Sequence, residues 1–375
     1  LDGAYPGKVR ANERNLNTEI GVPITIIGGK EAKNSKVLWL LNFFKAVRII
    51  LTKDKNYPEI LILEMAADRP GDIKYLASFA HPDIAVVTAI GEMPVHLEFF
   101  PERDGYVSEK ANIIKNLKPG GTAVLNYDDL SVREFRDRVP SGRSRIYYGF
   151  QEGADVRISD FSYNIPVSCE EIEKSGMEFK VEYFGESTGG GELLESTSSK
   201  IEKTIGVPPL YAVMAGIAVG TAFGIKISDS AKSLEKFSAP KNRLELLKGV
   251  KNTIIINDSY NSSPVACEAA LDLLSKFKKQ RKIAVLGSMR ELGKNTEEAH
   301  RMIGKKASKI SDIVFLVGDE TVFAKDEAEK SGKKNGEDLF WFDTSEEAKT
   351  KVQQVLLEGD VVLIKGSRSI KMEAV

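Results

Sequence analysis

KIAVLG, at residues 282–287, is an apolar run rich in β-branched residues that ends where polar residues begin. Similar runs occupy residues 253–257, 313–318, 339–343 and 361–366, and helical patterns separate them near 264–278, 296–309, 321–330 and 345–357. Strands that alternate with helical crossovers predict a parallel sheet. Such a sheet binds ligands at the carboxyl ends of its strands. We therefore expect chemistry at the polar residues found there, which are Asn257, Asp258, Ser288, Asp319, Asp343 and Ser367.

The first part of the chain repeats this alternation and predicts a second α/β sheet. Its apolar runs lie at 60–65, 84–90, 122–126 and 145–149, with helical patterns at 71–80, 105–117 and 130–138. Short alternating strands between about 154 and 203 predict a small antiparallel subregion that contains a flexible Gly/Ser/Thr-rich loop at 187–200. The segment 210–225 predicts a buried helix, and 37–51 an amphipathic one. We expect two domains, residues 1–238 and 239–375, with a hinge at 237–243.

Composition excludes several classes of protein. The 375 residues carry 53 Lys+Arg against 54 Asp+Glu, so no basic field indicates nucleic acid or an anionic membrane. No apolar run reaches the length of a membrane span. Cys169 and Cys267 fit no disulfide framework or zinc spacing, which favours a reducing compartment. The chain begins with Leu1, without a signal region. We expect a cytoplasmic monomer that is the remainder of a longer chain.

Three residues of the first domain could act together. Glu64 ends one apolar strand, His96 lies in a loop after another, and Lys110 lies in a helix-like run. Taken singly, the carboxylate is as readily a helix-cap neighbour, and the histidine and lysine are more often solvated surface residues. Together, a Glu, a His and a modified Lys offer the oxygen and nitrogen donors that could hold magnesium beside a phosphate.

Six short motifs resemble those of the Mur ligase family. In the first domain they are NLNTEIGVP at 15–23, EMAADRPGDI at 64–73, and AIGE at 89–92 leading into HLE at 96–98. In the second domain NDSYNSSP at 257–264 is similar to DDSYNANP, LGSMRELG at 286–293 to LGDMxELG, and KGSRSIKME at 365–373 to KGSRGMRME. The SYNxxP string and the KGSR ending favour the MurF type within that family.

The resemblance implies a fold and an activity. The fold would be α/β: a Mur ligase central domain, mostly parallel and truncated at its start, followed by a Rossmann-like C-terminal domain. The activity would be that of an ATP-dependent amide-bond ligase that adds D-alanyl-D-alanine to UDP-N-acetylmuramoyl-tripeptide through an acyl phosphate, in peptidoglycan precursor synthesis. Its cofactors would be ATP and Mg²⁺, and its partners those two substrates, with no nucleic acid.

The resemblance also implies roles for individual residues. Glu64 and His96 match magnesium ligands, and Lys110 matches a lysine that carbon dioxide carbamylates to help place a second magnesium. The remaining matches contact nucleotide or substrate. Arg243, Asp258 and either Asn257 or Asn261 would face ATP; Asn15, Asn17 and Thr18 would face the UDP-muramoyl substrate; and Lys365, Ser367 and Arg368 would contact the D-alanyl-D-alanine carboxylate. From the residues alone, a solvated hinge residue is the favoured interpretation of Arg243 and a helix cap that of Asp258, while His81 and His300 are expected to be structural.

The chain departs from the family pattern in three places. No G-x-x-G-K-[ST] phosphate loop is present, and the look-alike Gly28-Gly29-Lys30 follows the NLNTEIGVP motif instead of preceding it. GVPPLYA at 206–212 stands where the family has GKHNxYA or its Gln form, which removes a nucleotide contact. Ser288 replaces the aspartate of LGDM, so the motif loses its carboxylate. A chain with no phosphate loop would lose activity.

Other functions remain open at this stage. A MurE-type or folylpolyglutamate-type ligase would differ in the amine that stimulates ATP hydrolysis. A non-catalytic remnant that only binds nucleotide or UDP-sugar would release no phosphate. A nicotinamide-dependent oxidoreductase is disfavoured because no G-x-G-x-x-G follows any strand.

Overall fold

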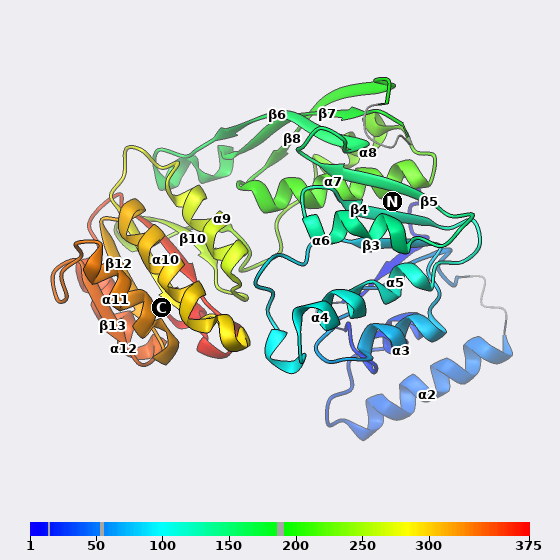
Figure 1. The fold of residues 1–375 in the computed structure, drawn as a ribbon, viewed down its shortest axis with the longest axis horizontal. Coiled ribbons are helices and arrows are strands. Elements are labelled where there is room, and N and C mark those ends of the chain that lie inside the picture. Colours follow the sequence, from blue (N-terminus) through cyan, green and yellow to red (C-terminus); the bar gives the residue numbers. More distant parts are fainter. Residues whose placement is uncertain (14–15, 53–55, 186–190) are drawn as a thin grey trace.

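The C-terminal part of the protein is a six-stranded sheet covered by helices on both faces (Figure 1). A computed structural model describes residues 1–13, 16–52, 56–185 and 191–375. The strand order is β13-β12-β11-β14-β10-β9, and every neighbouring pair is parallel except β9 with β10. These strands are β9 (Glu245–Lys248), β10 (Ile254–Asp258), β11 (Lys282–Gly287), β12 (Ile313–Val317), β13 (Leu339–Phe342) and β14 (Val361–Lys365). The predicted parallel sheet is confirmed.

Alternation along β11 shows why this sheet needs helices on both sides. Ala284 and Leu286 belong to an apolar cluster that also contains residues of three helices of this domain. Ile283 and Val285, on the opposite face, belong to a second cluster that contains residues of a fourth helix. A strand buried on both faces has no polar side to expose, which explains its continuous apolar run. The three helices are α9 (Pro264–Leu274), α10 (Thr296–Ile310) and α11 (Val322–Lys330), and the fourth is α12 (Ser345–Val355).

The first part of the chain forms a second six-stranded sheet and a separate parallel pair of strands. The six strands follow chain order: β3 (Ile84–Val87), β4 (Thr122–Asn126), β5 (Ser144–Gly149), β6 (Val156–Asn164), β7 (Gly176–Tyr183) and β8 (Glu195–Glu202). β3 to β6 are parallel, and β6, β7 and β8 are antiparallel, as expected for the small subregion. The pair is β1 (Val9–Ala11) with β2 (Ile60–Ile62).

Short helices follow several of these strands. α1 (Gly21–Ile27) and α2 (Lys36–Leu51) lie between β1 and β2, and α3 (Asp72–Phe79) leads to β3. The predicted helix at 105–117 is divided at Ala111 into α4 (Arg103–Lys110) and α5 (Asn112–Lys115). The remaining helices are α6 (Leu130–Arg133), α7 (Val207–Ala222) and α8 (Ile227–Leu234), and the 3₁₀ turns are η1 (Leu97–Phe99), η2 (Glu134–Arg138), η3 (Cys169–Lys174), η4 (Val250–Asn252), η5 (Gly293–Asn295), η6 (Asp319–Thr321), η7 (Arg368–Ile370) and η8 (Met372–Ala374).

The prediction of a flexible loop at 187–200 is wrong for its second half. Residues from Glu195 onward form β8, which pairs with all of β7. Ile201 is buried, and the Ser199 hydroxyl donates to the Ala231 carbonyl of α8 at 3.2 Å. Small hydroxyl residues can alternate along an edge strand when the neighbouring strand supplies the backbone hydrogen bonds. Residues 187–190 of this prediction lie outside the described residues.

The buried helix predicted at 210–225 is confirmed as α7, and it joins the two sheets. Leu210, Val213, Met214 and Ile217 are buried. They belong to one apolar cluster that runs from the central sheet to Leu273 and the C-terminal sheet. This shared packing holds the two α/β units together, although the predicted boundary at 238/239 stays a prediction.

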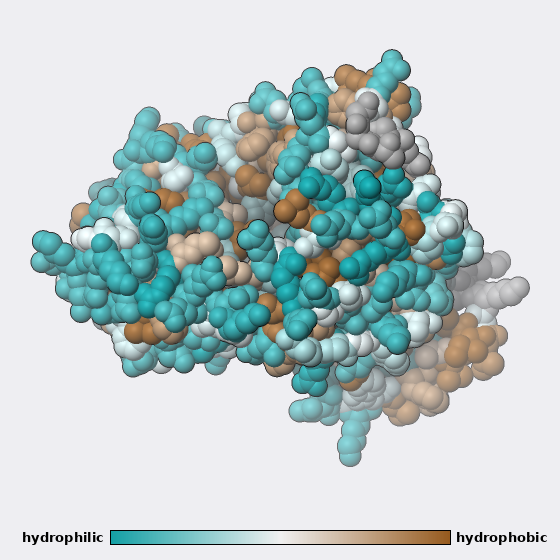
Figure 2. All heavy atoms as spheres, in the orientation of Figure 1, coloured by the Kyte–Doolittle hydropathy of each residue, from teal (hydrophilic) through white to brown (hydrophobic). Residues whose placement is uncertain are grey.

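α2 confirms the helix predicted at 37–51 but does not bury an apolar face. Asn42 is its one buried residue, and its side chain bonds the backbone N–H and carbonyl of Lys30 at 3.1 and 2.8 Å. Phe43 and Phe44 are 63% and 59% exposed. Figure 2 shows hydrophobic surface at the place where Figure 1 draws this helix. Within the described residues, no helix is both long and apolar enough to span a membrane.

An ion pair with a buried carboxylate joins the residues that precede β11 and β14. The Asp360 carboxylate is 2% exposed and accepts hydrogen bonds from Arg281 Nε and Nη2 at 2.9 and 2.6 Å. It also accepts one from the Leu357 N–H at 2.7 Å. A bidentate guanidinium–carboxylate pair of this kind is among the stronger polar contacts in proteins.

We predict that Asp360→Ala lowers the free energy of unfolding by about 3 kcal/mol, because it leaves a guanidinium and an N–H without their acceptor. Urea denaturation followed by the fluorescence of Trp341, in β13, measures this effect in the correct domain. The matched control is Asp137→Ala, whose side chain is 78% exposed and pairs with Arg136; we expect a change within about 0.5 kcal/mol. Equal effects of the two variants would contradict the prediction.

Candidate functional site

Glu64 and Asn17 are brought together just beyond the end of β2. Asn17 Nδ2 donates to Glu64 Oε1 at 3.1 Å, and the Glu64 N–H donates to Asn12 Oδ1 at 2.5 Å. Thr18 lies at the start of α1, where its hydroxyl accepts from the Gly21 N–H at 3.5 Å. Of the three residues predicted to face the muramoyl substrate, Asn17 therefore lies beside Glu64, Thr18 precedes α1, and Asn15 lies outside the described residues.

Lys110 lies at the end of α4 among carboxylates. Burial lowers the pKa of the Lys110 amine. Negative charges oppose this shift, and they belong to Asp68, Glu64 and Glu109. Tyr106, one turn earlier, has its ring centroid 5.4 Å from Lys110 Nζ, and burial raises the pKa of its hydroxyl to about 12. The structure thus places Lys110 in the same charged environment as Glu64.

His96 lies between the two α/β units. Its Nε2 is 3.5 Å from Asp68 Oδ1, in the central domain, and its Nδ1 is 2.5 Å from Glu291 Oε2, in the C-terminal domain. The Nδ1 atom is buried, and the carboxylate is near enough for an ion pair without being aligned for a hydrogen bond. Asp68 therefore contacts His96 and exerts the largest of the charge effects on the pKa of Lys110, and Glu64 acts on the same lysine.

The chemistry of these donors fits magnesium. Mg²⁺ prefers oxygen ligands, and Glu64 and Asp68 supply carboxylates, while a Lys110 carbamate would add another. In the described part of the chain, no three His, Cys, Asp or Glu side chains already form a metal-binding group. The residues therefore suit the ion only if Lys110 is modified or if the substrate completes the set.

In the C-terminal domain, Asp258 and Lys365 contact each other across neighbouring strands. Lys365 Nζ donates to Asp258 Oδ2 at 2.6 Å and to the Asn261 carbonyl at 2.9 Å. The other Asp258 oxygen accepts from the Leu244 N–H at 3.2 Å. Burial raises the pKa of Asp258, and the adjacent ammonium of Lys365 opposes that shift. Asp258 and Lys365, which were each predicted to contact a ligand, thus form an ion pair with each other in this structure.

Tyr260 lies between two of the predicted arginines. The guanidinium carbon of Arg243 is 4.2 Å from the centroid of its ring, and that of Arg368 is 6.0 Å from it. Arg368 also pairs with Glu373 at 2.9 Å. Cation–π contact holds an arginine in place while its N–H groups stay available to an anion. Tyr260 brings the predicted nucleotide residue and the predicted substrate residue to one surface.

Asn257 and Asn261 have different surroundings. Asn257 Nδ2 donates to Asn242 Oδ1 at 2.9 Å, and its Oδ1 accepts from the Ser259 hydroxyl at 2.8 Å. Asn261 is exposed, and its Oδ1 accepts from the Ser262 N–H at 2.8 Å. Of the two residues that could face adenine, Asn261 is the more accessible.

Polar residues after β11, β12 and β14 meet at one edge of the sheet, as predicted. The Ser367 hydroxyl accepts from the Arg290 N–H at 2.8 Å, and the Arg290 guanidinium donates to Asp319 at 2.6 Å. The Ser288 hydroxyl is buried and forms no hydrogen bond within the described residues. Among the described residues, the Ser288 side chain therefore has no polar partner in place of those of the family aspartate.

Two segments that depart from the family pattern have structural roles. Gly28 ends α1 in the left-handed conformation at φ 62°, and its carbonyl accepts from Lys45 Nζ. A helix C-terminus presents carbonyls, which repel phosphate, so Gly28-Gly29-Lys30 is no phosphate loop. In the segment 206–212, the Tyr211 hydroxyl donates to Asp128 at 2.8 Å.

The remaining histidines and cysteines agree with structural roles. The His300 ring accepts from the Met289 N–H at 3.0 Å, and burial lowers its pKa. His81 is exposed, and its Nδ1 lies 3.3 Å from the Asn116 carbonyl. Cys169 and Cys267 are both buried free thiols.

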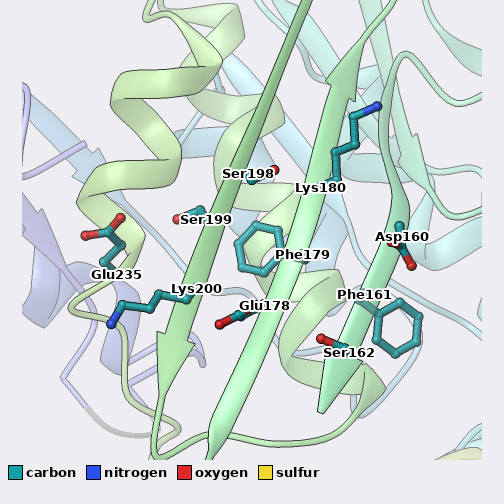
Figure 3. Close-up of a pocket in the computed structure, with 10 residues that line it drawn as sticks. All are labelled: Asp160, Phe161, Ser162, Glu178, Phe179, Lys180, Ser198, Ser199, Lys200 and Glu235. Atoms are coloured by element: carbon teal, nitrogen blue, oxygen red, sulfur yellow. The ribbon is translucent and has the colours of Figure 1, made fainter. Parts of the chain in front are cut away.

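A shallow hollow of about 440 Å³ lies away from this site, on the antiparallel strands β6 to β8 (Figure 3). Lys180, Lys200, Glu178 and Glu235 surround it together with the rings of Phe161 and Phe179. Among the described residues that line it, none is a predicted site residue. Mixed charges and an open shape give this surface no evident ligand.

The structure adds Asp68, Glu291 and Tyr260 to the candidate site. All three lie inside motifs quoted from the sequence, at 64–73, 286–293 and 257–264. The sequence signal was therefore present, but nothing in it indicated which motif residues face His96 or the arginines.

Two family models match the chain. That of the Mur ligase middle domain matches residues 7–188, and that of the Mur ligase glutamate ligase domain matches residues 242–368. A UDP-N-acetylmuramoyl-tripeptide–D-alanyl-D-alanine ligase of Bacillus subtilis is 29% identical over 98% of this chain and 69% of its own length. The Escherichia coli protein of the same name is 25% identical over 96% of this chain and 68% of its own.

Solved structures agree with these matches. The MurF ligase of Thermotoga maritima in complex with ADP superposes with a TM-score of 0.73 at 26% identity, covering 99% of this chain and 73% of that one. MurF from Acinetobacter baumannii has a TM-score of 0.75 at 22% identity, with 99% and 70% covered, and shows the same fold. With its two domains matched in order over most of its length, this chain belongs to the Mur ligase family.

Proposed function

We propose that this chain supplies the central and C-terminal domains of an ATP-dependent ligase that joins D-alanyl-D-alanine to UDP-N-acetylmuramoyl-tripeptide in peptidoglycan precursor synthesis. Curated relatives that align with nearly the whole chain carry this name. The ADP bound to the Thermotoga maritima relative supports the use of ATP. The two buried free thiols are consistent with the reducing cytoplasm, where we place the protein.

One observation carries the proposal: the charges of Asp68, Glu64 and Glu109 act on Lys110 at the end of α4, and Asp68 contacts His96, which also meets Glu291 of the other domain. A neutral amine is the form that reacts with carbon dioxide. Carbamylation of Lys110 replaces a cation by an anion, which turns a lysine that would repel a metal into an oxygen ligand. Glu64, His96 and carbamylated Lys110 would then hold magnesium. When bound, the ion screens the repulsion between a carboxylate nucleophile and a polyphosphate.

The chemistry requires two displacements. A carboxylate oxygen of the tripeptide bonds to the γ-phosphorus of ATP as the bond from that phosphorus to ADP breaks. The amine of D-alanyl-D-alanine then attacks the acyl carbon, loses a proton, and phosphate leaves. The protein must therefore hold two anions and an amine close together, which is chiefly a task of positioning and charge stabilisation.

We assign the positioning of these groups to the residues that match the family motifs. Arg243 would approach the nucleotide phosphates or ribose, with Asp258, Asn257 and Asn261 near the ribose and base. Asn17 and Thr18, with Asn15, would face the muramoyl substrate. Arg368, with Lys365 and Ser367, would contact the carboxylate of D-alanyl-D-alanine. Arg243 supports this assignment best, because its guanidinium carbon lies 4.2 Å from the centroid of the Tyr260 ring, a contact that orients the group and leaves its N–H groups able to bind anions. The guanidinium of Arg368 lies 6.0 Å from the same ring and pairs with Glu373.

We expect phosphate release from ATP to require D-alanyl-D-alanine, UDP-N-acetylmuramoyl-tripeptide and Mg²⁺ together. A coupled phosphate assay, with mass spectrometry of the pentapeptide product, tests this expectation. Single amino acids in place of the dipeptide serve as the control. Stimulation by a single amino acid would indicate a MurE-type or folylpolyglutamate-type ligase instead, and no release with every substrate present would favour a protein that only binds its ligands.

We predict that Lys110→Ala removes a carbamate signal from the ¹³C NMR spectrum of the protein in ¹³C-bicarbonate, and lowers the rate of phosphate release at least about 100-fold. The reason is that the alanine side chain has no amine, so carbon dioxide cannot form a carbamate at position 110. Added bicarbonate would not restore activity. Lys115→Ala, on the exposed side of α5, is the matched control and should keep both the signal and the rate. A carbamate signal that survives in Lys110→Ala would refute the assignment.

A further inference from the structure

The two domains meet where the loop before α4 reaches the loop before α10 (Figure 1). The meeting point is the contact of His96 Nδ1 with Glu291 Oε2 at 2.5 Å. Close backbone packing supports it, since a Cβ atom placed on Gly293 would lie 3.3 Å from Glu98 Cα. His96 is one of the proposed magnesium ligands, and its partner here comes from the other domain.

The loop that carries His96 is anchored on the central domain. The Asp129 carboxylate accepts hydrogen bonds from the N–H groups of Ile90 and Gly91 at 2.7 and 2.8 Å. Arg103, in α4, donates to the carbonyls of Gly91 and Glu92 at 2.7 and 3.1 Å. The start of the loop is therefore held from two sides, so the position of His96 follows from that of the sheet.

The loop that carries Glu291 is anchored on the C-terminal domain. The Met289 N–H donates to His300 Nε2 at 3.0 Å, and the Arg290 N–H donates to Ser367 Oγ at 2.8 Å. The Arg290 side chain pairs with Asp319 at 2.6 Å. Both residues before Glu291 are thus fixed by backbone hydrogen bonds, so the backbone that carries Glu291 is held on this domain.

Both partners have left-handed backbone, which is unfavourable for residues with a side chain. φ is 68° at His96 and 67° at Glu291. Such conformations persist where surrounding contacts enforce them, and they cluster at functional sites. Here they occur at the two ends of one contact between domains.

We propose that Glu291 is a positioning residue that binds Nδ1 of His96 and so turns Nε2 toward Asp68 and the proposed magnesium site. The inference rests on the proposed function. Histidines that ligate metals commonly have a carboxylate at their other ring nitrogen, which fixes the orientation of the ring. Here Glu291 Oε2 lies within ion-pair distance of Nδ1, without hydrogen-bond alignment, so the charge of the carboxylate holds the ring. The Nε2 atom of His96 already lies 3.5 Å from Asp68 Oδ1, on the side where Lys110 is surrounded by carboxylates.

The consequence is a link between domain docking and the metal site. The central domain supplies Glu64, His96 and Lys110, whereas the carboxylate that orients His96 arrives with the C-terminal domain. The site is complete only when the two domains are in contact. A bound ion would in turn favour the docked arrangement, because linkage between two binding events is reciprocal.

The test uses Glu291→Gln in this chain, with two measurements that do not require turnover. The chain has three histidines, so a ¹⁵N-histidine spectrum resolves each ring. We expect the His96 ring nitrogens to shift in Glu291→Gln while those of His81 and His300 stay in place. We also expect Mn²⁺, used as a paramagnetic probe for magnesium, to bind about 10-fold to 100-fold more weakly.

The matched control is Glu98→Gln, which removes the same charge from the same interface at an exposed residue that packs beside Gly293. Glu291→Asp is a second variant: it keeps the charge and tolerates left-handed backbone, but its carboxylate is one methylene shorter. We expect Glu291→Asp to bind Mn²⁺ with an affinity between those of the unaltered chain and Glu291→Gln. This variant keeps the test decisive if Glu291→Gln does not fold.

Two results would overturn the inference. One is an Mn²⁺ affinity of Glu291→Gln equal to that of Glu98→Gln, which would reduce Glu291 to a contact between domains. The other is an unaltered chain that binds no Mn²⁺. Neither result depends on phosphate release, so a failure of the proposed ligase activity is recognised separately in the coupled assay.

Discussion

Parallel pairing of strands is the constraint that brings the polar side chains of this protein together. When neighbouring strands run in one direction, their carboxyl ends share one edge of the sheet. In the C-terminal domain this register places Asp258 opposite Lys365, which form an ion pair of 2.6 Å. It also lets Arg290 contact both Asp319 and Ser367 although they follow different strands. With the strands reversed, these residues would lie at opposite edges.

In the central domain Glu64 follows β2 and His96 follows β3. These strands belong to separate sheets, and the loops after them bring both residues to the region of Lys110. The edges of the two sheets then meet through loops, not through the sheets themselves. The His96–Glu291 contact spans that boundary, while α7 and its apolar neighbours hold the domains together elsewhere. A site divided in this way combines a rigid frame on each side with a contact that forms only when the frames are docked.

Prediction from sequence succeeded where a local pattern reports a local environment. The apolar runs of the C-terminal sheet are buried on both faces, so their composition alone indicates the strands, as Ile313–Val317 illustrates. It failed where the environment comes from elsewhere in the chain. The polar run ending in β8 looked like a loop, yet β7 pairs with it and α8 packs beneath it. The sequence predicted α2 to be an amphipathic helix, yet its apolar side chains Phe43 and Phe44 are exposed instead of packed against the protein.

The residues of the candidate site could be predicted from local sequence, whereas their partners could not. Residue types and motif spacing sufficed to name Glu64, His96 and Lys110, and to expect polar residues at the ends of the parallel strands, because those features lie within short stretches of chain. The partners of these residues did not follow from the sequence. Glu291 meets His96, and Lys365 meets Asp258, across more than one hundred intervening residues. Such pairs depend on how loops from separate sheets pack in space, and packing is a property of the folded chain as a whole.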